Sequence, residues 1–201
     1  MRHTIALNAS APDNAGTIFG EEEAAVNKPA ENNQQALAEP WDKGDALVLQ
    51  PDEGESYWQP KPANGYTSIK VSPRNCRSNH VSFGVQMIAP GGYVREHWHD
   101  SHDELLFCFE GTGTFLVDGV AHKAVPGTTV FVGRWVKHKI INDGPGEFKM
   151  TWTYLPPAIH NFFEAIGRPR KAGEPAPEPF ARPENTLAAE KAAGFGPKIG
   201  E

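Results

Sequence analysis

This sequence has few cysteines, no long apolar runs and no excess of positive charge. Only Cys76 and Cys108 occur among 201 residues, which excludes a disulfide-stapled scaffold and favours the reducing cytoplasm. No stretch approaches the roughly 18–20 consecutive apolar residues that span a bilayer, and residues 1–8 have too short an apolar run for a signal peptide. The 19 Lys and Arg against 25 Asp and Glu give a formal net charge of −6, which disfavours nonspecific nucleic-acid binding. We therefore expect a cytoplasmic protein that binds neither membranes nor nucleic acid.

The amino-terminal part of the chain has little that could form a core. Residues 1–40 contain one aromatic residue, Phe19, and six acidic residues against two basic ones. So little apolar surface cannot offset the entropy lost on ordering the chain. We predict an extension over residues 1–45 that is flexible or orders only against a partner subunit.

Residues 46–155 are typical of an all-β domain. Short runs rich in Val, Ile, Phe, Thr and Trp alternate with turn residues, and turns recur about every 8–12 residues. Over residues 80–87 the apolar side chains stand at every second position, as on one buried face of a strand. Asp118-Gly119 predicts a two-residue hairpin, because both central positions of such a turn need a positive φ. We expect antiparallel strands closed into a barrel, which removes exposed edges.

The pattern changes over residues 156–201. A helix face is formed by Ile159, Phe162, Phe163 and Ile166. This spacing predicts a helix that ends at Gly167 and caps the barrel from outside. Residues 168–201 hold six prolines, so we expect an irregular tail with one short helix near 185–193.

The histidines carry the chemical signal. Five of the eight lie between positions 97 and 138. His97 and His99 are one residue apart, and on a strand such side chains leave the same face. Glu104 follows across a polar stretch that could turn the chain back, and His138 lies on a later strand among apolar neighbours. If these faces are interior, three imidazoles and one carboxylate can meet inside the barrel; the alternative is a chance cluster on polar loops.

Such a donor set has a clear metal preference. Three imidazoles and a carboxylate suit Fe(II), Mn(II), Ni(II), Co(II) or Zn(II), and they leave coordination positions open for a substrate. Without a cation, an ionised Glu104 in an apolar barrel would carry a large desolvation cost. We expect a divalent transition metal at this site, of undetermined identity.

These residues resemble the two motifs of the cupin superfamily. The first, G-x5-H-x-H-x4-E-x6-G, is matched at every spacing by Gly91, His97, His99, Glu104 and Gly111. The second, G-x5-P-x-G-x2-H-x3-N, is matched by Gly127, His138 and Asn142, with Gly133 and Trp135 in place of its proline and second glycine. The resemblance covers roughly residues 80–155. It implies a jelly-roll-like double-stranded β-barrel over 46–155, flanked by the extension and by a short helical cap with an irregular tail.

The resemblance also implies how the chain works. His97, His99, Glu104 and His138 bind the metal. Cupins commonly self-associate, so we expect a homodimer. Phe107 and Phe109 share one face of a strand and would form part of an association surface; the alternative for them is core packing. Residues 162–169 are similar to the segment after the barrel in single-domain bacterial cupins, including quercetin-dioxygenase-like ones.

Single-domain cupins with this ligand set imply a dioxygenase that acts on a small aromatic, enol or diketone substrate. Glu104 would also loosen from the ion and act as general base, because a carboxylate in an apolar pocket has a raised pKa. The residues expected to contact the substrate are His102, Phe83, Val85, Met150, Trp152, Tyr154 and Trp135. His102 lies in a polar stretch, and the alternative for it is simple solvation.

Two other functions fit the same residues. A non-oxidative isomerase, lyase or decarboxylase would use the ion as a Lewis acid. A non-catalytic cupin would bind a small molecule without converting it. Fold and ligands constrain the reaction class only loosely.

Overall fold

The computed structural model describes residues 44–195. The predicted extension over 1–45 lies outside the described residues except for its last two, and it stays a prediction. Within the described range, no helix has the length and apolar character that a membrane crossing requires.

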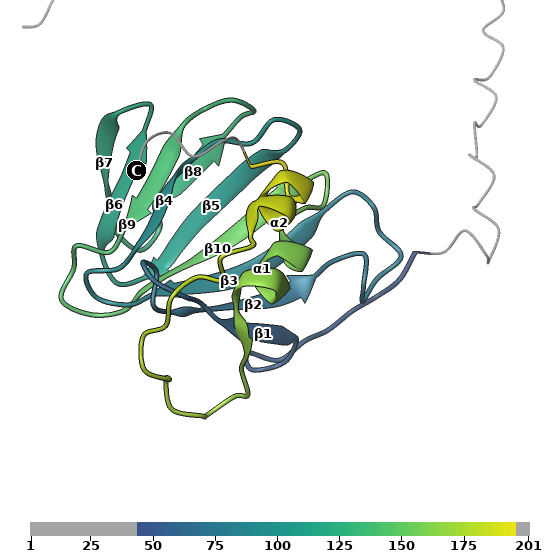
Figure 1. Cartoon of the computed structure of the whole chain (residues 1–201). Helices are drawn as coiled ribbons and strands as arrows, with labels where there is room; N and C mark the ends of the chain where they lie inside the picture. Colours follow the sequence, from purple (N-terminus) through teal and green to yellow (C-terminus); the bar gives the residue numbers. More distant parts are fainter. Residues whose placement is uncertain (1–43, 196–201) are drawn as a thin grey trace, which may run out of the picture. The chain divides into compact units, whose positions relative to one another are not determined.

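Two antiparallel sheets form the body of the described chain (Figure 1). The seven-stranded sheet has the order β11-β1-β2-β3-β10-β5-β8. Its strands are β1 (Glu55–Trp58), β2 (Tyr66–Val71), β3 (Ser82–Ile88), β5 (Asp103–Glu110), β8 (Thr129–Val132), β10 (Phe148–Leu155) and β11 (Arg168–Pro169). The four-stranded sheet has the order β4-β9-β6-β7, with β4 (Tyr93–His97), β6 (Gly113–Val117), β7 (Val120–Ala124) and β9 (His138–Ile141). The predicted all-β double-stranded barrel is confirmed.

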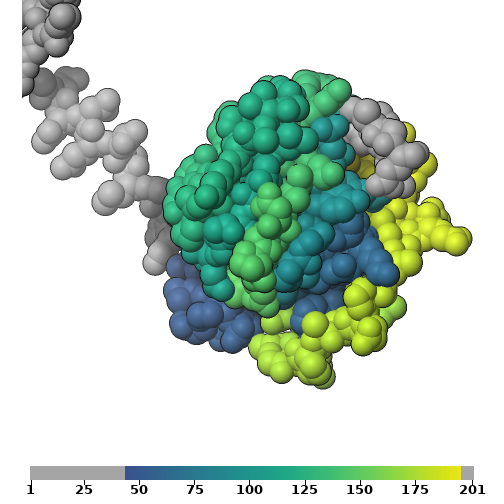
Figure 2. All heavy atoms as spheres, turned by 90° about the vertical axis from the view of Figure 1, so that its left-hand side faces the viewer, coloured from purple at the N-terminus to yellow at the C-terminus, as the bar shows by residue number. Residues whose placement is uncertain are grey.

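The predicted hairpin lies between β6 and β7. Asp118 and Gly119 have φ values of 45° and 82°, and Val117 pairs with Val120 across the turn. Both central residues therefore adopt the left-handed conformation that matches the twist of the flanking strands. Figure 2 shows the molecule from the side of this smaller sheet, with the yellow carboxy-terminal segment along one edge.

Strand β10 is central to the larger sheet and to the core. It pairs with β3 on one side and β5 on the other. Its inward residues are Phe148, Met150, Trp152 and Tyr154, each at most 2% exposed. The strict alternation of these residues with partly exposed ones is the period-two pattern that the sequence predicted.

Strand β3 presents the opposite face from the one expected. The prediction that Phe83 and Val85 face the interior is wrong: both are only partly buried and line a groove on the outside of the sheet. Gly84 and Gln86 are buried instead. The reason is the bulk of Trp152, since a Cβ atom on Gly84 would lie 2.2 Å from Cζ2 of that indole. Only a residue without a side chain fits on the inner face there.

The described part of the chain has two helices, both after β10. Helix α1 (His160–Ile166) ends as predicted at Gly167, whose amide donates to the Phe163 carbonyl. Its apolar face is buried and forms part of the wall of a cavity, in keeping with the short helical cap that was expected after the barrel. Helix α2 (Leu187–Ala192) is the predicted short helix of the tail.

Candidate metal centre

Four side chains from separate strands and turns converge at one end of the described barrel. His97 ends β4 and pairs with His138 at the start of β9. His99 follows two residues later, and Glu104 lies on β5 opposite Tyr154 of β10. One nitrogen or oxygen atom from each of the three histidines and Glu104 lies within 4.8 Å of the other three. The structure therefore brings together the four predicted ligands.

The cluster is almost completely shielded from water. His99, Glu104 and His138 are at most 2% exposed. Oε2 of Glu104 lies 3.2 Å from Nε2 of His99 and 2.9 Å from Nε2 of His138. Burial and the neighbouring charges of His138 and His99 hold the pKa of His97 well below its ordinary value, so this imidazole is neutral and free to donate its lone pair.

The pKa of Glu104 moves opposite to expectation. Burial alone would raise it, but the contacts with His138 and His99 outweigh burial and hold the pKa of Glu104 well below its usual range. Burial lowers the pKa of His138, and its contact with Glu104 outweighs burial and raises it. The prediction of a raised pKa for Glu104 is wrong because an apolar pocket was assumed where two imidazoles lie. A general-base role for Glu104 stays a prediction and loses that support.

Two imidazole rings are held by main-chain carbonyls. Nδ1 of His97 lies 2.8 Å from the carbonyl oxygen of Arg95, and Nδ1 of His138 lies 3.1 Å from that of Val136. A carbonyl oxygen only accepts, so each Nδ1 carries the proton. The Nε2 lone pairs are then directed into the cluster, as in metal sites whose ligands are oriented by outer hydrogen bonds.

Buried nitrogens without a partner show that the cluster fits a cation. Nδ1 of His99 and Nε2 of His138 are buried and have no partner in hydrogen-bond geometry; the latter approaches Glu104 without the required alignment. Buried polar atoms are nearly always satisfied. A divalent transition metal among three imidazoles and a carboxylate would satisfy them. The group could therefore hold a metal ion.

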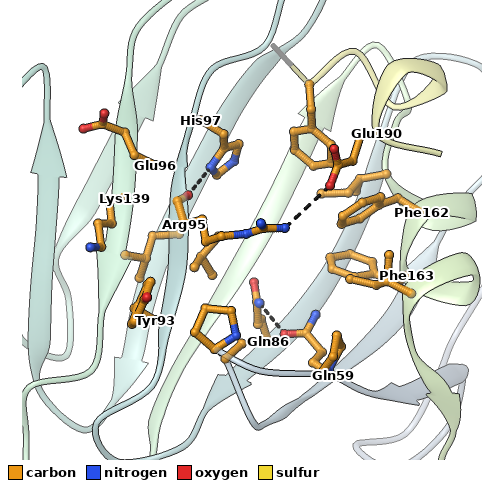
Figure 3. A pocket seen from close by; sticks show the side chains of 18 of the residues that line it. Gln59, Gln86, Tyr93, Arg95, Glu96, His97, Lys139, Phe162, Phe163 and Glu190 are labelled. Atoms are coloured by element: carbon orange, nitrogen blue, oxygen red, sulfur yellow. Dashed lines mark hydrogen bonds and ion pairs between the residues drawn. The ribbon is translucent and has the colours of Figure 1, made fainter. Parts of the chain in front are cut away.

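A cavity of about 400 Å³ adjoins the cluster (Figure 3). His97 and Glu104 form part of its wall, so the candidate metal site opens onto it. Apolar residues of the wall include Leu116, Ile140, Tyr154, Ile159, Phe162, Phe163, Ile166 and Phe195. Polar residues of the wall include Gln59, Gln86, Arg95, Arg182 and Glu190. Mostly apolar walls with a few polar groups are typical of a small-molecule site.

Phe195 is a wall residue that sequence reasoning missed. Its ring centroid lies 5.1 Å from that of His97, 5.2 Å from that of His99 and 4.7 Å from that of Phe162. An isolated bridge between His99 and Phe195 ties this end of the described chain to the site. A lone aromatic residue between glycines in a proline-rich tail forms no pattern that would predict a place in the site. Arg95 was also missed, although it stands two residues before His97 on one strand and so shares its face.

Comparison with known proteins bears on the same segment. The model of the family described as the cupin domain matches residues 84–154, a range that includes all four candidate ligands. The tetracenomycin polyketide synthase protein TcmJ from Streptomyces glaucescens is 27% identical over 119 residues, which cover 59% of this chain and 76% of that protein. The polyketide cyclase RemF from Streptomyces resistomycificus superposes with a TM-score of 0.50 at 11% identity, over 55% of this chain and 80% of that one; this likeness shows the fold.

The chain departs at Trp135 from the second motif that it resembles. This residue has a φ of 69°, in the left-handed region that the motif's glycine would occupy without strain. Its amide donates to the His99 carbonyl at 2.8 Å, and its ring lies 4.6 Å from that of Trp98. These two contacts hold Trp135 in its left-handed conformation. Trp135 is 61% exposed and does not line the cavity.

The other predicted substrate contacts are unevenly placed around the cavity. Tyr154 lines the cavity. Met150 and Trp152 are buried in the core and are absent from the cavity wall. His102 has its ring centroid 6.4 Å from that of His99 and lies outside the ligand group. Phe83 and Val85 line the outer groove instead.

Proposed function

We propose that this chain is a metal-dependent enzyme that acts on a planar, enolisable substrate of aromatic or polyketone type. One observation carries the proposal: two of the four candidate ligands, His97 and Glu104, form part of the wall of a cavity whose remaining wall is largely aromatic and aliphatic. A flat, apolar molecule with a keto or enol oxygen would fill such a space with its oxygen toward the ion.

Each part of the site has a role in this proposal. The ion held by His97, His99, Glu104 and His138 would supply Lewis acidity toward an enolate oxygen. Phe162 and Phe195 face the same space and would bind the flat face of the substrate and exclude water. Burial and the charge of Glu104 raise the pKa of Tyr154 well above its ordinary value. Its phenol therefore stays protonated and can donate a hydrogen bond toward a substrate oxygen.

Non-oxidative enolate chemistry is our first candidate, within the isomerase, lyase or decarboxylase class. Its support is the similarity to TcmJ, a polyketide synthase protein, because polyketones are enolisable. A dioxygenase is the second candidate. The three imidazoles and one carboxylate favour it, since they suit Fe(II), Mn(II) or Ni(II) and leave positions for a second reactant. A quercetin-dioxygenase-like enzyme would belong to this second class.

Elemental analysis followed by turnover assays tests the proposal. The full chain would be purified, its metal quantified, and a panel of aromatic polyketones, diketones and flavonols offered under air and under argon. Metal-dependent conversion that persists under argon is expected for the first candidate, and conversion with matching O2 uptake for the second. The H97A/H99A variant should convert nothing. Binding of panel members without conversion in either atmosphere would indicate a binding protein and overturn the enzymatic proposal.

We propose further that the protein works as a homodimer in the cytoplasm. The exposed apolar residues on the outer faces of β5 and β8 are Leu105, Phe107, Phe109 and Phe131, between 36% and 65% exposed. Neighbouring apolar side chains of this size on one sheet face are typical of an association surface. Cys76 and Cys108 are both free thiols, in keeping with a reducing compartment.

A further inference from the structure

A guanidinium projects into the cavity beside the candidate metal centre. Arg95 stands two residues before His97 on β4, and its side chain crosses the cavity toward Glu190 of α2 (Figure 3). Nη2 of Arg95 lies 3.5 Å from Oε1 of Glu190, beyond the usual range of an N–H···O hydrogen bond. The Arg95 and Glu190 side chains are only 22% and 13% exposed. This ion pair is therefore loose although it is largely shielded from water.

Glu190 is held more firmly by other partners. Its Oε1 atom lies 2.8 Å from Nη1 of Arg182 and 3.3 Å from the hydroxyl of Thr186. The same oxygen is thus shared by two guanidiniums and a hydroxyl. Two positive charges face one negative charge in this cluster, and the excess of one positive charge lies on the cavity wall. Arg182 has a close carboxylate partner, whereas Arg95 does not.

The other charged residues of the wall do not neutralise Arg95. Glu96 is the next residue on β4 and points away from Arg95 to the other side of the strand (Figure 3). Lys139 lies with its ammonium 4.3 Å from the ring centroid of Tyr93. Within the described part of the chain, Glu190 is the one carboxylate within ion-pair distance of Arg95. A guanidinium carries five donors in a planar fork that matches a carboxylate, and most of them are unused here.

We propose that Arg95 binds a carboxylate group of the substrate. This inference rests on the proposed function and names the substrate class more closely: a planar aromatic or polyketone acid. Its carboxylate would pair with Arg95 beside α2, and its flat part would lie along Phe162 and Phe195. Its enolisable oxygen would face His97 and Glu104. The incoming charge balances the excess positive charge while Glu190 stays with Arg182. Arg95 and Glu190 act as specificity-determining and positioning residues.

A matched pair of fluorescent probes tests this assignment without turnover. One is a hydroxynaphthoate with its hydroxyl and carboxylate on opposite rings, and the other is the corresponding neutral carboxamide. Dissociation constants would be measured on the full chain with its resident metal and again after EDTA treatment. We expect the carboxylate to bind about tenfold more tightly than the carboxamide, both with the resident metal and after EDTA treatment, since a charge-assisted pair adds that much affinity. A preference that vanishes with EDTA would show that the metal binds the carboxylate, and it would overturn the assignment.

Three variants test which residue causes the preference for the carboxylate over the carboxamide. R95M should reduce the ratio of the two constants to about one, and E190Q should increase it, because a competing negative charge is removed. K139M removes a cation from the same wall and should leave most of the preference in place. Retention of the preference in R95M, or an equal loss in K139M, would overturn the assignment, as would failure of both probes to bind. Metal-dependent conversion of neutral substrates with no carboxylate preference would refute this inference alone, whereas a carboxylate preference without conversion would refute only the proposed function.

Discussion

The imidazole of His97 donates from Nδ1 to the carbonyl oxygen of Arg95, 2.8 Å away. One residue of β4 thus orients a candidate metal ligand through its main chain while its side chain reaches across the cavity toward Glu190. His138 uses the carbonyl of Val136 in the same way. Because these hydrogen bonds come from the backbone, substitution of the Arg95 side chain should leave the orientation of His97 intact.

Metal content should depend on the histidine cluster. We expect about one divalent ion per chain in the native protein and almost none in H97A/H99A, measured by elemental analysis. Removing the ion should lower Tm by about 5–10 °C where free metal is about 100 times its Kd, because a ligand of the folded state stabilises it. H122A is the control, since His122 is exposed on β7. Equal metal in both variants would refute the centre.

Asn142 should be a large contributor to stability. It is fully buried, donates to the carbonyls of Ile88 and Gly146, and accepts from the amide of Gly144. N142A leaves these groups without partners, so we expect the free energy of unfolding to fall by about 2–4 kcal/mol. Urea denaturation measures this, with N79A at an exposed position as the control. Similar midpoints for the two variants would contradict the role of Asn142.

Gly84 should tolerate no side chain. An added Cβ would lie 2.2 Å from Trp152 and 2.5 Å from the Ser68 carbonyl oxygen, so G84A forces the two central strands of the large sheet apart. We expect a loss of about 2–3 kcal/mol in the free energy of unfolding, accompanied by a shift in tryptophan fluorescence. G146A is the control, because a Cβ atom added at Gly146 would meet no atom within 4 Å. A neutral G84A would contradict the packing described for β3 and β10.

The two cysteines should react at different rates. Cys108 is fully buried, and burial raises the pKa of its thiol, whereas Cys76 is partly exposed. A raised pKa means less thiolate near neutral pH, and the thiolate is the reactive form. Iodoacetamide should therefore label Cys76 first at pH 8, as read by mass spectrometry of C76S and C108S. Denaturation should remove the difference; fast labelling of Cys108 in the folded protein would contradict its burial.

If the protein is a dimer, polar substitutions on the outer face of β5 and β8 should lower its mass in solution. In sedimentation experiments the native protein should have twice the mass of one chain, and F107S/F131S should shift it toward the monomer. Both side chains lie on neighbouring strands, and Phe131 is 65% exposed. V120S is the control, since Val120 is 57% exposed on the other sheet. A monomeric native protein, or dissociation of V120S alone, would refute this surface as the interface.

Local patterns in the sequence determined much of this protein. The spacing of His97, His99, Glu104 and His138 predicted the candidate ligand set. Asp118-Gly119 and Gly167 predicted a hairpin and a helix end. These features depend on neighbours in the chain, where a period of two or a positive φ is a local requirement.

Only the tertiary structure decided which face of β3 is buried, where α1 packs, and what surrounds the ligands. Alternation shows that a strand has two different faces, but the bulk of Trp152 on a distant strand determined that Gly84 and not Phe83 lies inside. Phe195 and Glu190 reach the site from the far end of the described chain. Such contacts are made between residues about a hundred positions apart and leave no periodic trace in the sequence.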